Sequence, residues 1–174
     1  MLALHFLIAG FLGVQLEMPF AHKLKERIDK IVSQAETKQS ALIPVLHEVQ
    51  SEMGWLSPES MQEVAEILGI TPASVQNVAT FYTMFFTKPV GKHVLWLCRT
   101  LSCSMRGAEQ VEKYLKEKLQ IHSGETTPDG KITLLEAECL ASCGTAPVML
   151  ADDELHENLT KKKVDELIEK FRRE

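Results

Sequence analysis

Four cysteines, arranged as two close pairs in the second half of the chain, restrict most strongly what this sequence can fold into. Cys98 and Cys103 are separated by four residues, Cys139 and Cys143 by three, and 35 residues lie between the two pairs. A secreted disulfide framework usually spreads its cysteines and follows a signal peptide. Close pairs that come after 97 residues without any cysteine instead favour metal binding or redox chemistry.

The spacing within the pairs leaves alternatives open. Structural zinc prefers Cys-x2-Cys pairs, and both pairs here are longer. Thioredoxin-type catalysis requires Cys-x-x-Cys, which is absent. A plant-type ferredoxin also starts with Cys-x4-Cys but needs a further cysteine two residues on, whereas Ser104, Met105 and Arg106 follow Cys103. From spacing alone, a two-iron cluster with two thiolates from each loop is only modestly favoured over zinc.

The first half of the chain predicts a bundle of four short helices over residues 18–88. Apolar side chains recur at helix spacing over residues 22–36 and 41–53, and Ser40 is expected to cap the second helix. Ser57–Pro58 and Thr71–Pro72 each resemble an N-cap followed by a first helical residue, and Gly69 ends the third helix. Four such helices cannot form a sheet, so they indicate a helical bundle or arm.

A dense aromatic cluster closes this helical region. Its members are Phe81, Tyr82, Met84, Phe85 and Phe86. We expect them to pack as core between the helices and the part of the chain that follows.

Residues 89–174 alternate strand and helix patterns. The near-continuous apolar run at 93–98 predicts a strand buried on both faces, and 131–137, 147–151 and 154–157 predict three more. A helix is expected over residues 105–119 and another after Thr160. In the first, Met105, Ala108, Val111, Leu115 and Leu119 share one face. This order predicts an α/β layer with the cysteine loops at one end of its sheet.

The cysteine loops carry the only chemistry that the sequence singles out. Small residues surround the thiols and let the backbone approach sulfur: Ser102, Ser104, Gly107, Ser142 and Gly144. No glycine-rich nucleotide motif and no nucleophile–histidine–acid arrangement is recognisable. With a formal net charge of -5 and no basic face, a nucleic-acid partner is not expected. The pattern favours an electron carrier that depends on a partner to hold substrate, over a zinc-stabilised docking module or a dithiol enzyme.

Residues 1–17 form an apolar N-terminal extension. The stretch 2–16 is almost wholly apolar but shorter than the roughly 20 residues of a membrane helix, so a direct membrane span is not expected. A secretory signal has basic residues before its apolar segment, and no basic residue precedes this stretch. We expect Met18 to be the natural start, with an apolar anchor or interaction segment as the alternative.

Several longer sequence segments resemble those of a known protein family. GWLSPES (54–60), ATFYTMF (79–85), VLWLCRTLSC (94–103), GETTPDGKITL (124–134) and ECLASCGTAPVM (138–149) resemble the thioredoxin-like [2Fe–2S] subunit of bacterial respiratory complex I, the NADH-quinone oxidoreductase. The resemblance runs from about residue 20 to the C-terminus. It implies an α+β or α/β fold, in which a helical N-terminal region precedes a thioredoxin-like ferredoxin domain at 89–174.

The same resemblance implies a cofactor, a partner and a location. Cys98, Cys103, Cys139 and Cys143 would ligate one [2Fe–2S] cluster. The partner would be the larger flavin subunit, which binds NADH and FMN, in the cytoplasmic peripheral arm of an inner-membrane complex. Within the family the cluster lies near the flavin but off the main electron path to quinone. Similar subunits serve NAD-linked hydrogenases and formate dehydrogenases, and nothing in this chain separates those complexes.

One position departs from the family pattern. Many relatives have Gly between the last two cysteines, where this chain has Ala141. A methyl group there is expected to crowd an amide that approaches sulfur or to rule out a positive φ. The expected consequence is an altered potential or loop shape.

Overall fold

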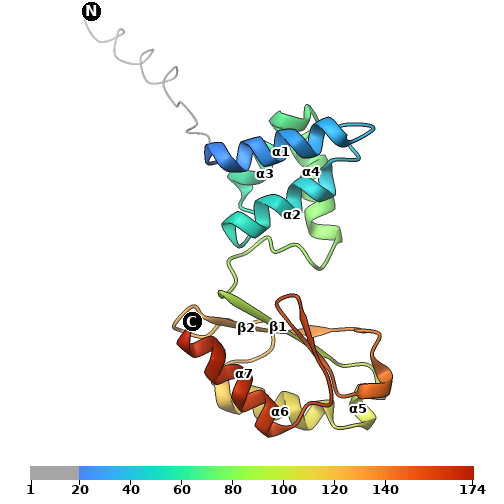
Figure 1. The fold of residues 1–174 in the computed structure, drawn as a ribbon, viewed down its shortest axis with the longest axis vertical. Coiled ribbons are helices and arrows are strands. Elements are labelled where there is room, and N and C mark those ends of the chain that lie inside the picture. The colour runs from blue at the N-terminus through green and yellow to red at the C-terminus, as the bar shows by residue number, and fades with distance from the viewer. Residues whose placement is uncertain (1–19) are drawn as a thin grey trace, which may run out of the picture. The chain divides into compact units, whose positions relative to one another are not determined.

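The computed structural model describes residues 20–174, so the expectations for residues 1–17 lie outside the described part of the chain. The chain divides into two compact units between Lys88 and Pro89. The first is helical and the second combines a sheet with helices (Figure 1). Within the described residues, no helix is both long and apolar enough to cross a membrane.

The helical unit contains α1 (His22–Gln34), α2 (Leu42–Met53), α3 (Pro58–Leu68) and α4 (Pro72–Phe81). The predicted caps of α3 and α4 are confirmed, because the Ser57 hydroxyl accepts from the Ser60 N–H and the Thr71 hydroxyl accepts from the Ser74 N–H. Each such cap is worth about 1 kcal/mol.

The predicted cap of α2 is wrong. Ala41 occupies the N-cap position, and the Ser40 hydroxyl hydrogen-bonds with Thr37 instead. The turn that precedes α2 therefore satisfies the serine locally, before the helix begins.

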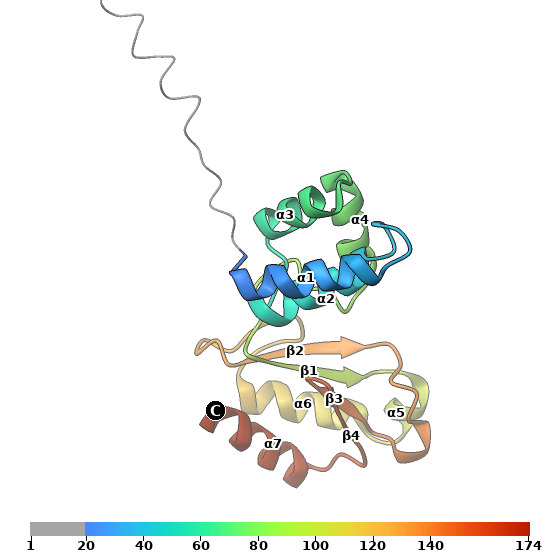
Figure 2. The ribbon, with the colours of Figure 1, turned by 45° about the horizontal axis from the view of Figure 1, so that its top comes forward.

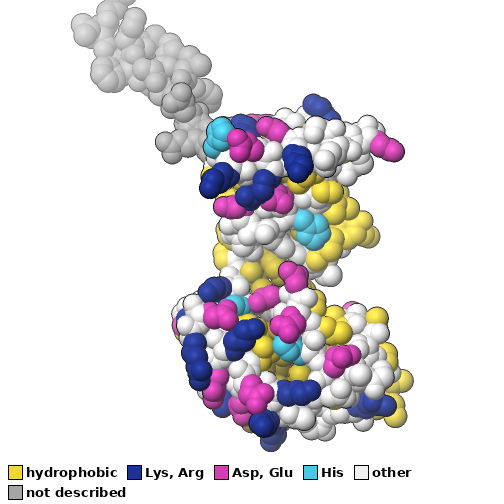
Figure 3. Space-filling model, in the orientation of Figure 1, with side chains coloured by type: hydrophobic (Ala, Val, Ile, Leu, Met, Phe, Trp, Pro, Cys, Tyr) yellow, Lys and Arg dark blue, Asp and Glu magenta, His cyan; other side chains and the backbone are white. Residues whose placement is uncertain are grey.

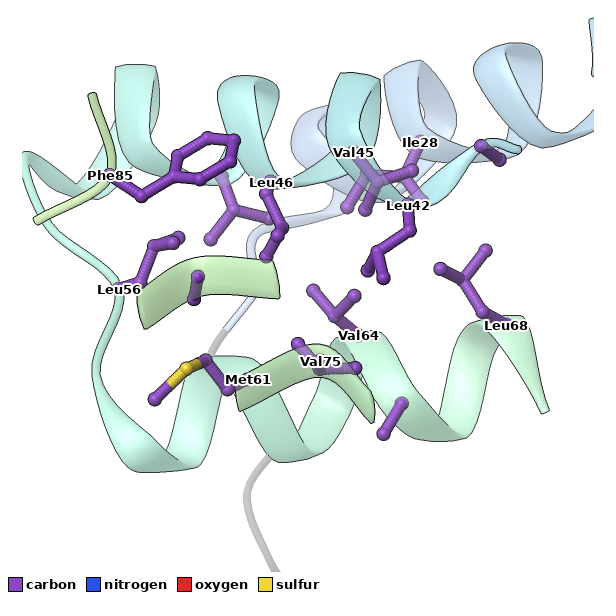
Figure 4. Packing of buried hydrophobic residues seen from close by; sticks show 14 of the residues in the cluster. Ile28, Leu42, Val45, Leu46, Leu56, Met61, Val64, Leu68, Val75 and Phe85 are labelled. Atoms are coloured by element: carbon purple, nitrogen blue, oxygen red, sulfur yellow. The ribbon is translucent and has the colours of Figure 1, made fainter. Parts of the chain in front are cut away.

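Four helices enclose one apolar core (Figure 4). Ile28, Leu46 and Val64 come from three different helices, and Leu56 comes from the α2–α3 connection; all four are fully buried. Complete burial of side chains of this size is worth about 1.5–3 kcal/mol each, so the helices depend on one another for stability.

The aromatic cluster of residues 81–86 is only partly in this core, which corrects the expectation that it packs as a whole. Phe85 is buried against the ring of His47, but Phe81 is 77% exposed. The chain turns after α4 because the Gln50 side chain holds the backbone beyond it: its amide donates to the Met84 carbonyl and its oxygen accepts from the Phe86 N–H. This turn leaves Phe81 on the outside.

The second unit is built on a four-stranded mixed sheet in the order β2-β1-β3-β4. Its strands are β1 (His93–Cys98), β2 (Ile132–Ala137), β3 (Met149–Ala151) and β4 (Glu154–His156). β1 and β2 are parallel, whereas β3 pairs antiparallel with both β1 and β4. β3 begins at Met149, two residues later than predicted, and is preceded by Pro147, which has no N–H to pair, and by Val148, whose carbonyl accepts from the Cys98 N–H.

Helices α6 (Ala108–Leu119) and α7 (Lys161–Arg173) lie on the same side of the sheet (Figure 2). Leu115 of α6, Ile168 of α7 and Leu95 of β1 share one buried core. The predicted Thr160 cap of α7 is confirmed, since its hydroxyl accepts from the Lys163 N–H.

The predicted helix over residues 105–119 is wrong in its first part. A separate short helix, α5 (Leu101–Met105), comes first, and the chain breaks at Arg106 and Gly107 before α6. Gly107 has a φ of 101°, which a residue with a Cβ avoids. Met105 is consequently exposed and not on the buried face with Ala108.

Candidate metal centre

The two cysteine loops leave the sheet at the same edge. β1 ends at Cys98, whose register partner on the parallel strand β2 is Ala137, the last residue of that strand. Cys139 follows two residues later. Because parallel strands end on the same side of a sheet, the prediction that both pairs begin where a strand ends, at one end of the sheet, is confirmed.

The first pair is buried and the second is exposed. Cys98 and Cys103 are 2% and 1% exposed and pack with Ala146 and Val148. Cys103 is carried on α5, which returns the chain towards the end of β1. Cys139 and Cys143 lie at the surface, and all four thiols are free of disulfides.

Several hydrogen-bonding groups lie around the Cys98 sulfur. The Thr100 hydroxyl lies 3.3 Å from its Sγ. Burial by itself raises the pKa of the Cys98 thiol, but hydrogen bonds from the hydroxyl and N–H of Thr100, the N–H of Leu140 and the Cys103 thiol outweigh burial and lower that pKa. These hydrogen bonds act in favour of the thiolate, which is the form that ligates metal.

The Cys103 thiol shows the opposite shift. Burial raises its pKa, and its hydrogen bond to Cys98 and the nearby Cys98 and Cys143 thiols raise it further, while the Val148 N–H opposes them. Burial is the largest cause of the raised pKa, and repulsion between neighbouring thiolates adds to it. Electron-withdrawing metal relieves such repulsion, so the pair is better matched to a metal centre than to free thiolates.

Cys139 receives one backbone donor. The Ala141 N–H lies 3.4 Å from the Cys139 Sγ, and Ala141 has a φ of 57°. The expectation that a methyl group would exclude a positive φ here is therefore wrong: the loop adopts the left-handed conformation with alanine in place. It does so at a local cost of about 1–2 kcal/mol.

Cys143 opens a 3-10 turn, Cys143–Thr145, that two neighbouring segments hold. The Arg106 guanidinium, just beyond α5, donates to the Gly144 carbonyl over 2.9 Å. On the other side, the Ser142 and Thr145 hydroxyls both contact the Glu157 carboxylate. These hydroxyl groups, followed by the positive charge of Lys163, lower the pKa of Glu157.

Sequence reasoning did not identify Thr100, Arg106 or Glu157 as site residues. Thr100 had a local signal, since a hydroxyl two residues after a strand-terminal cysteine can fold back on the sulfur. Arg106 and Glu157 had none, because each reaches its partner from a different segment of the chain.

The donor set suits an iron–sulfur cluster. Four free thiols on two loops, with N–H and O–H donors at the sulfurs, match the thiolate ligation of such clusters and the hydrogen bonding that their sulfurs receive. Among residues 20–174, no three His, Cys, Asp or Glu side chains are already grouped to hold one metal ion. A two-iron cluster distributes its ligands as two thiolates on each iron, so it does not require three ligands around one point.

A cleft of about 500 Å³ adjoins Cys98. Arg99 lines it together with Glu109, Glu112 and Glu136, and the Arg99 guanidinium contacts the Glu136 carboxylate at 2.7 Å. The cleft combines an ion pair with further carboxylates, and its lining contains no histidine. The cleft is therefore a charged surface next to the cysteine site.

Comparison with known proteins places this geometry in a family. The chain matches the model of a family described as "Thioredoxin-like [2Fe-2S] ferredoxin" over residues 28–172. It is 42% identical to a subunit of the NADH-quinone oxidoreductase of Rhizobium meliloti, over 86% of this chain and 89% of that one. It is 43% identical to NADH-quinone oxidoreductase subunit 2 of Thermus thermophilus, over 76% and 74% respectively. A subunit of the Escherichia coli NADH-quinone oxidoreductase is 36% identical, over 85% and 89%.

A solved structure shows the same fold at lower identity. A chain of the NAD+-reducing [NiFe]-hydrogenase in its air-oxidised state superposes with a TM-score of 0.68 and 22% identity. The match covers 75% of this chain but only 22% of the hydrogenase chain. It shows a shared fold.

Proposed function

This chain belongs to the thioredoxin-like [2Fe–2S] ferredoxin family, and we propose that it is the electron-transfer subunit of an NADH-quinone oxidoreductase. The single observation that carries the proposal is the presence of four free cysteines on two loops at one sheet edge, in a chain that matches subunits of that complex over most of its length. Its relatives are subunits of an oxidoreductase complex, and the chain would act as one subunit of such a complex.

The proposed ligands are Cys98, Cys103, Cys139 and Cys143, two on each loop. When bound, a [2Fe–2S] cluster supplies a one-electron acceptor and donor. The chain's own residues prepare for the extra negative charge of the reduced state: the Thr100 hydroxyl and Ala141 N–H point donors at two of the sulfurs. Such hydrogen bonds stabilise the more negative state and so raise the reduction potential.

The two cysteine pairs differ in their exposure to solvent. Cys98 and Cys103 are enclosed by the protein, whereas Cys139 and Cys143 are exposed. Exchange of electrons with another protein is therefore favoured from the side of the second pair. The proposed partner on that side is the flavin subunit, which would hold FMN and NADH in the cytoplasmic peripheral arm of an inner-membrane complex.

The alternative parent complexes are an NAD-linked hydrogenase or formate dehydrogenase. The structural likeness to the hydrogenase chain is at 22% identity and supports only the fold, whereas the relatives at 36% to 43% identity are named as subunits of NADH-quinone oxidoreductase. A zinc-stabilised docking module is the less favoured alternative outside electron transfer.

Electron paramagnetic resonance on anaerobically purified full-length protein tests the proposal. We expect two irons per chain, a silent oxidised state and a paramagnetic signal that appears on addition of dithionite. Cys143→Ser should lower the cluster content or shift the spectrum. A colourless protein that binds zinc and stays silent in both states would instead establish the docking module, and an unchanged spectrum at full iron content in Cys143→Ser would remove Cys143 from the ligand set.

A further inference from the structure

The Cys143 loop is exposed at its centre, between Leu140 and Ala146, which pack in an apolar cluster. Cys143 and Gly144 are exposed, in contrast to Cys98 and Cys103 on the other loop. A ligand on such a loop keeps its position only if polar contacts fix the backbone on either side of it. The structure supplies these contacts from the segment between β4 and α7, which comes more than ten residues later in the sequence.

The Glu157 carboxylate contacts both hydroxyls that flank the 3-10 turn. Its Oε1 lies 2.6 Å from the Ser142 Oγ and 2.5 Å from the Thr145 Oγ1, and the two hydroxyl oxygens are 2.7 Å apart. The three oxygens thus form a triangle with two hydroxyl protons between them. An ionised carboxylate has no proton to donate. Whichever hydroxyl donates to the other, the Glu157 carboxylate therefore acts as a hydrogen-bond acceptor.

Main-chain bonds join the segment that follows Glu157 to the same loop. The Asn158 N–H donates to the Thr145 carbonyl over 2.7 Å, and the Leu159 N–H donates to the Pro147 carbonyl over 3.0 Å. The Lys163 ammonium, in the first turn of α7, donates to the Glu157 carbonyl over 2.9 Å. The backbone around Glu157 is therefore bonded both to the cysteine loop and to a lysine of α7.

We propose that Glu157 is a positioning residue for the Cys143 ligand: it anchors the Ser142–Thr145 loop and places a fixed negative charge beside the cluster site. This inference rests on the proposed function. It assigns two separable effects to one side chain. The hydrogen bonds hold the loop, and the charge opposes the extra electron of the reduced state and so lowers the reduction potential.

Glu157→Ala and Glu157→Gln separate these effects. Loss of an outer-shell partner commonly weakens metal binding about 10- to 100-fold, so Glu157→Ala should release iron to a chelator at least about tenfold faster than wild type. Glu157→Gln retains an oxygen acceptor and should release iron at nearly the wild-type rate. Both variants lack the carboxylate charge, so both should show a reduction potential shifted upwards in a titration followed by paramagnetic resonance.

Glu154→Ala is the matched control. Glu154 is the first residue of β4, three residues before Glu157; its side chain is 70% exposed and its carboxylate lies 3.8 Å from the His156 Nε2. It should leave both the rate of iron release and the potential unchanged. The pair Ser142→Ala with Thr145→Val should reproduce the fast iron release of Glu157→Ala, and adding Glu157→Ala to that pair should accelerate it no further.

The outcomes separate this inference from the function on which it rests. Wild-type protein that binds no two-iron cluster would overturn both. A wild type with its cluster, and a Glu157→Ala variant that matches Glu154→Ala in release rate and potential, would overturn the positioning role alone. Should Glu157→Ala fail to fold, the potential of Glu157→Gln decides, and an unshifted value there overturns the inference.

Discussion

The hydroxyl oxygen of Thr100 lies 3.3 Å from the Sγ of Cys98, on the buried side of the cysteine site. Thr100 is the N-cap residue of α5, yet its side chain makes no capping hydrogen bond to that helix. Its hydroxyl is instead directed to sulfur. Because this hydroxyl contacts the ligand sulfur and does not cap the helix, the conformation of the first loop affects the reduction potential of the site.

Thr100→Val should therefore lower the reduction potential of the cluster. Valine keeps the shape of the side chain but removes the O–H donor that stabilises the more negative reduced state. Thr100→Ser retains the donor and should restore most of the wild-type potential. A redox titration of the three proteins measures this, and equal potentials in Thr100→Val and wild type would show that the hydroxyl does not bond to the ligand sulfur.

Ala141→Gly should be neutral or stabilising by up to about 1 kcal/mol. Glycine removes the cost of a left-handed alanine, while the greater freedom of glycine in the unfolded chain offsets part of that gain. Chemical denaturation of the metal-free protein measures the difference.

Ala146→Gly is the control in the same loop. Ala146 has a φ of -59° and is buried, so glycine there gains nothing in the folded state and should destabilise the protein. Equal losses of stability in the two variants would mean that the positive φ of Ala141 carries no strain.

Local chemistry explains which parts of the fold the sequence predicts well. Ser57 and Thr71 cap their helices because a hydroxyl before a proline reaches N–H groups within three residues. Cys98 is predicted at a strand end because it closes an apolar run, and Cys139 because it follows the predicted strand 131–137 by two residues. In each case the interaction that decides the structure spans only a few residues.

The parts that the sequence does not predict have other causes, and two of them act over a long distance in sequence. Phe81 has the composition of a core residue, but the Gln50 side chain, more than 30 residues away in sequence, holds the chain segment that follows and leaves Phe81 exposed. Met105 falls on the helix period of Ala108, yet the positive φ of Gly107 separates the two. Glu157 acts on the cysteine site across 12 to 15 residues, a separation with no periodic signal.

Glu63→Gln should make the protein more stable at neutral pH. Glu63 is 3% exposed in the helical core, and burial raises its pKa above the ordinary 4.5, although the Phe20 N–H and the Lys25 charge act in the other direction. The native state then binds the proton more tightly than the unfolded chain. The free energy of unfolding therefore falls as pH rises from 4.5 through the folded-state pKa.

Urea denaturation over the acidic to neutral range checks this sign. Wild type and Glu63→Gln should converge below pH 4.5, where Glu63 is protonated in both states, and diverge above it. Glu36→Gln, at an exposed position in the same unit, should follow wild type throughout. Parallel curves for wild type and Glu63→Gln would show that burial does not raise the pKa of Glu63.

Phe81→Ser should weaken binding to the proposed flavin subunit. Phe81 is 77% exposed and stacks edge-on against Tyr82 at 5.0 Å, and Met84 nearby is also exposed. Figure 3 shows hydrophobic side chains gathered at the surface of the helical unit. An exposed aromatic group of this kind is typical of an interface anchor, and we expect its loss to cost about 1.4 kcal/mol of binding free energy, which is a tenfold change in affinity.

A point variant tests this docking role more sharply than a deletion. Removal of residues 18–60 would take away Ile28, Leu46 and Leu56 from the single core of the helical unit, so the remainder would unfold and binding would be lost for a trivial reason. Phe81→Ser removes only exposed surface and should change the free energy of unfolding by less than about 0.5 kcal/mol. Co-purification with the flavin subunit measures binding, with Glu36→Ala as the control at an exposed site outside the aromatic cluster. Undiminished recovery of the partner with Phe81→Ser would place the interface elsewhere, and the exposed Cys139 and Cys143 loop would then be the surface to vary next.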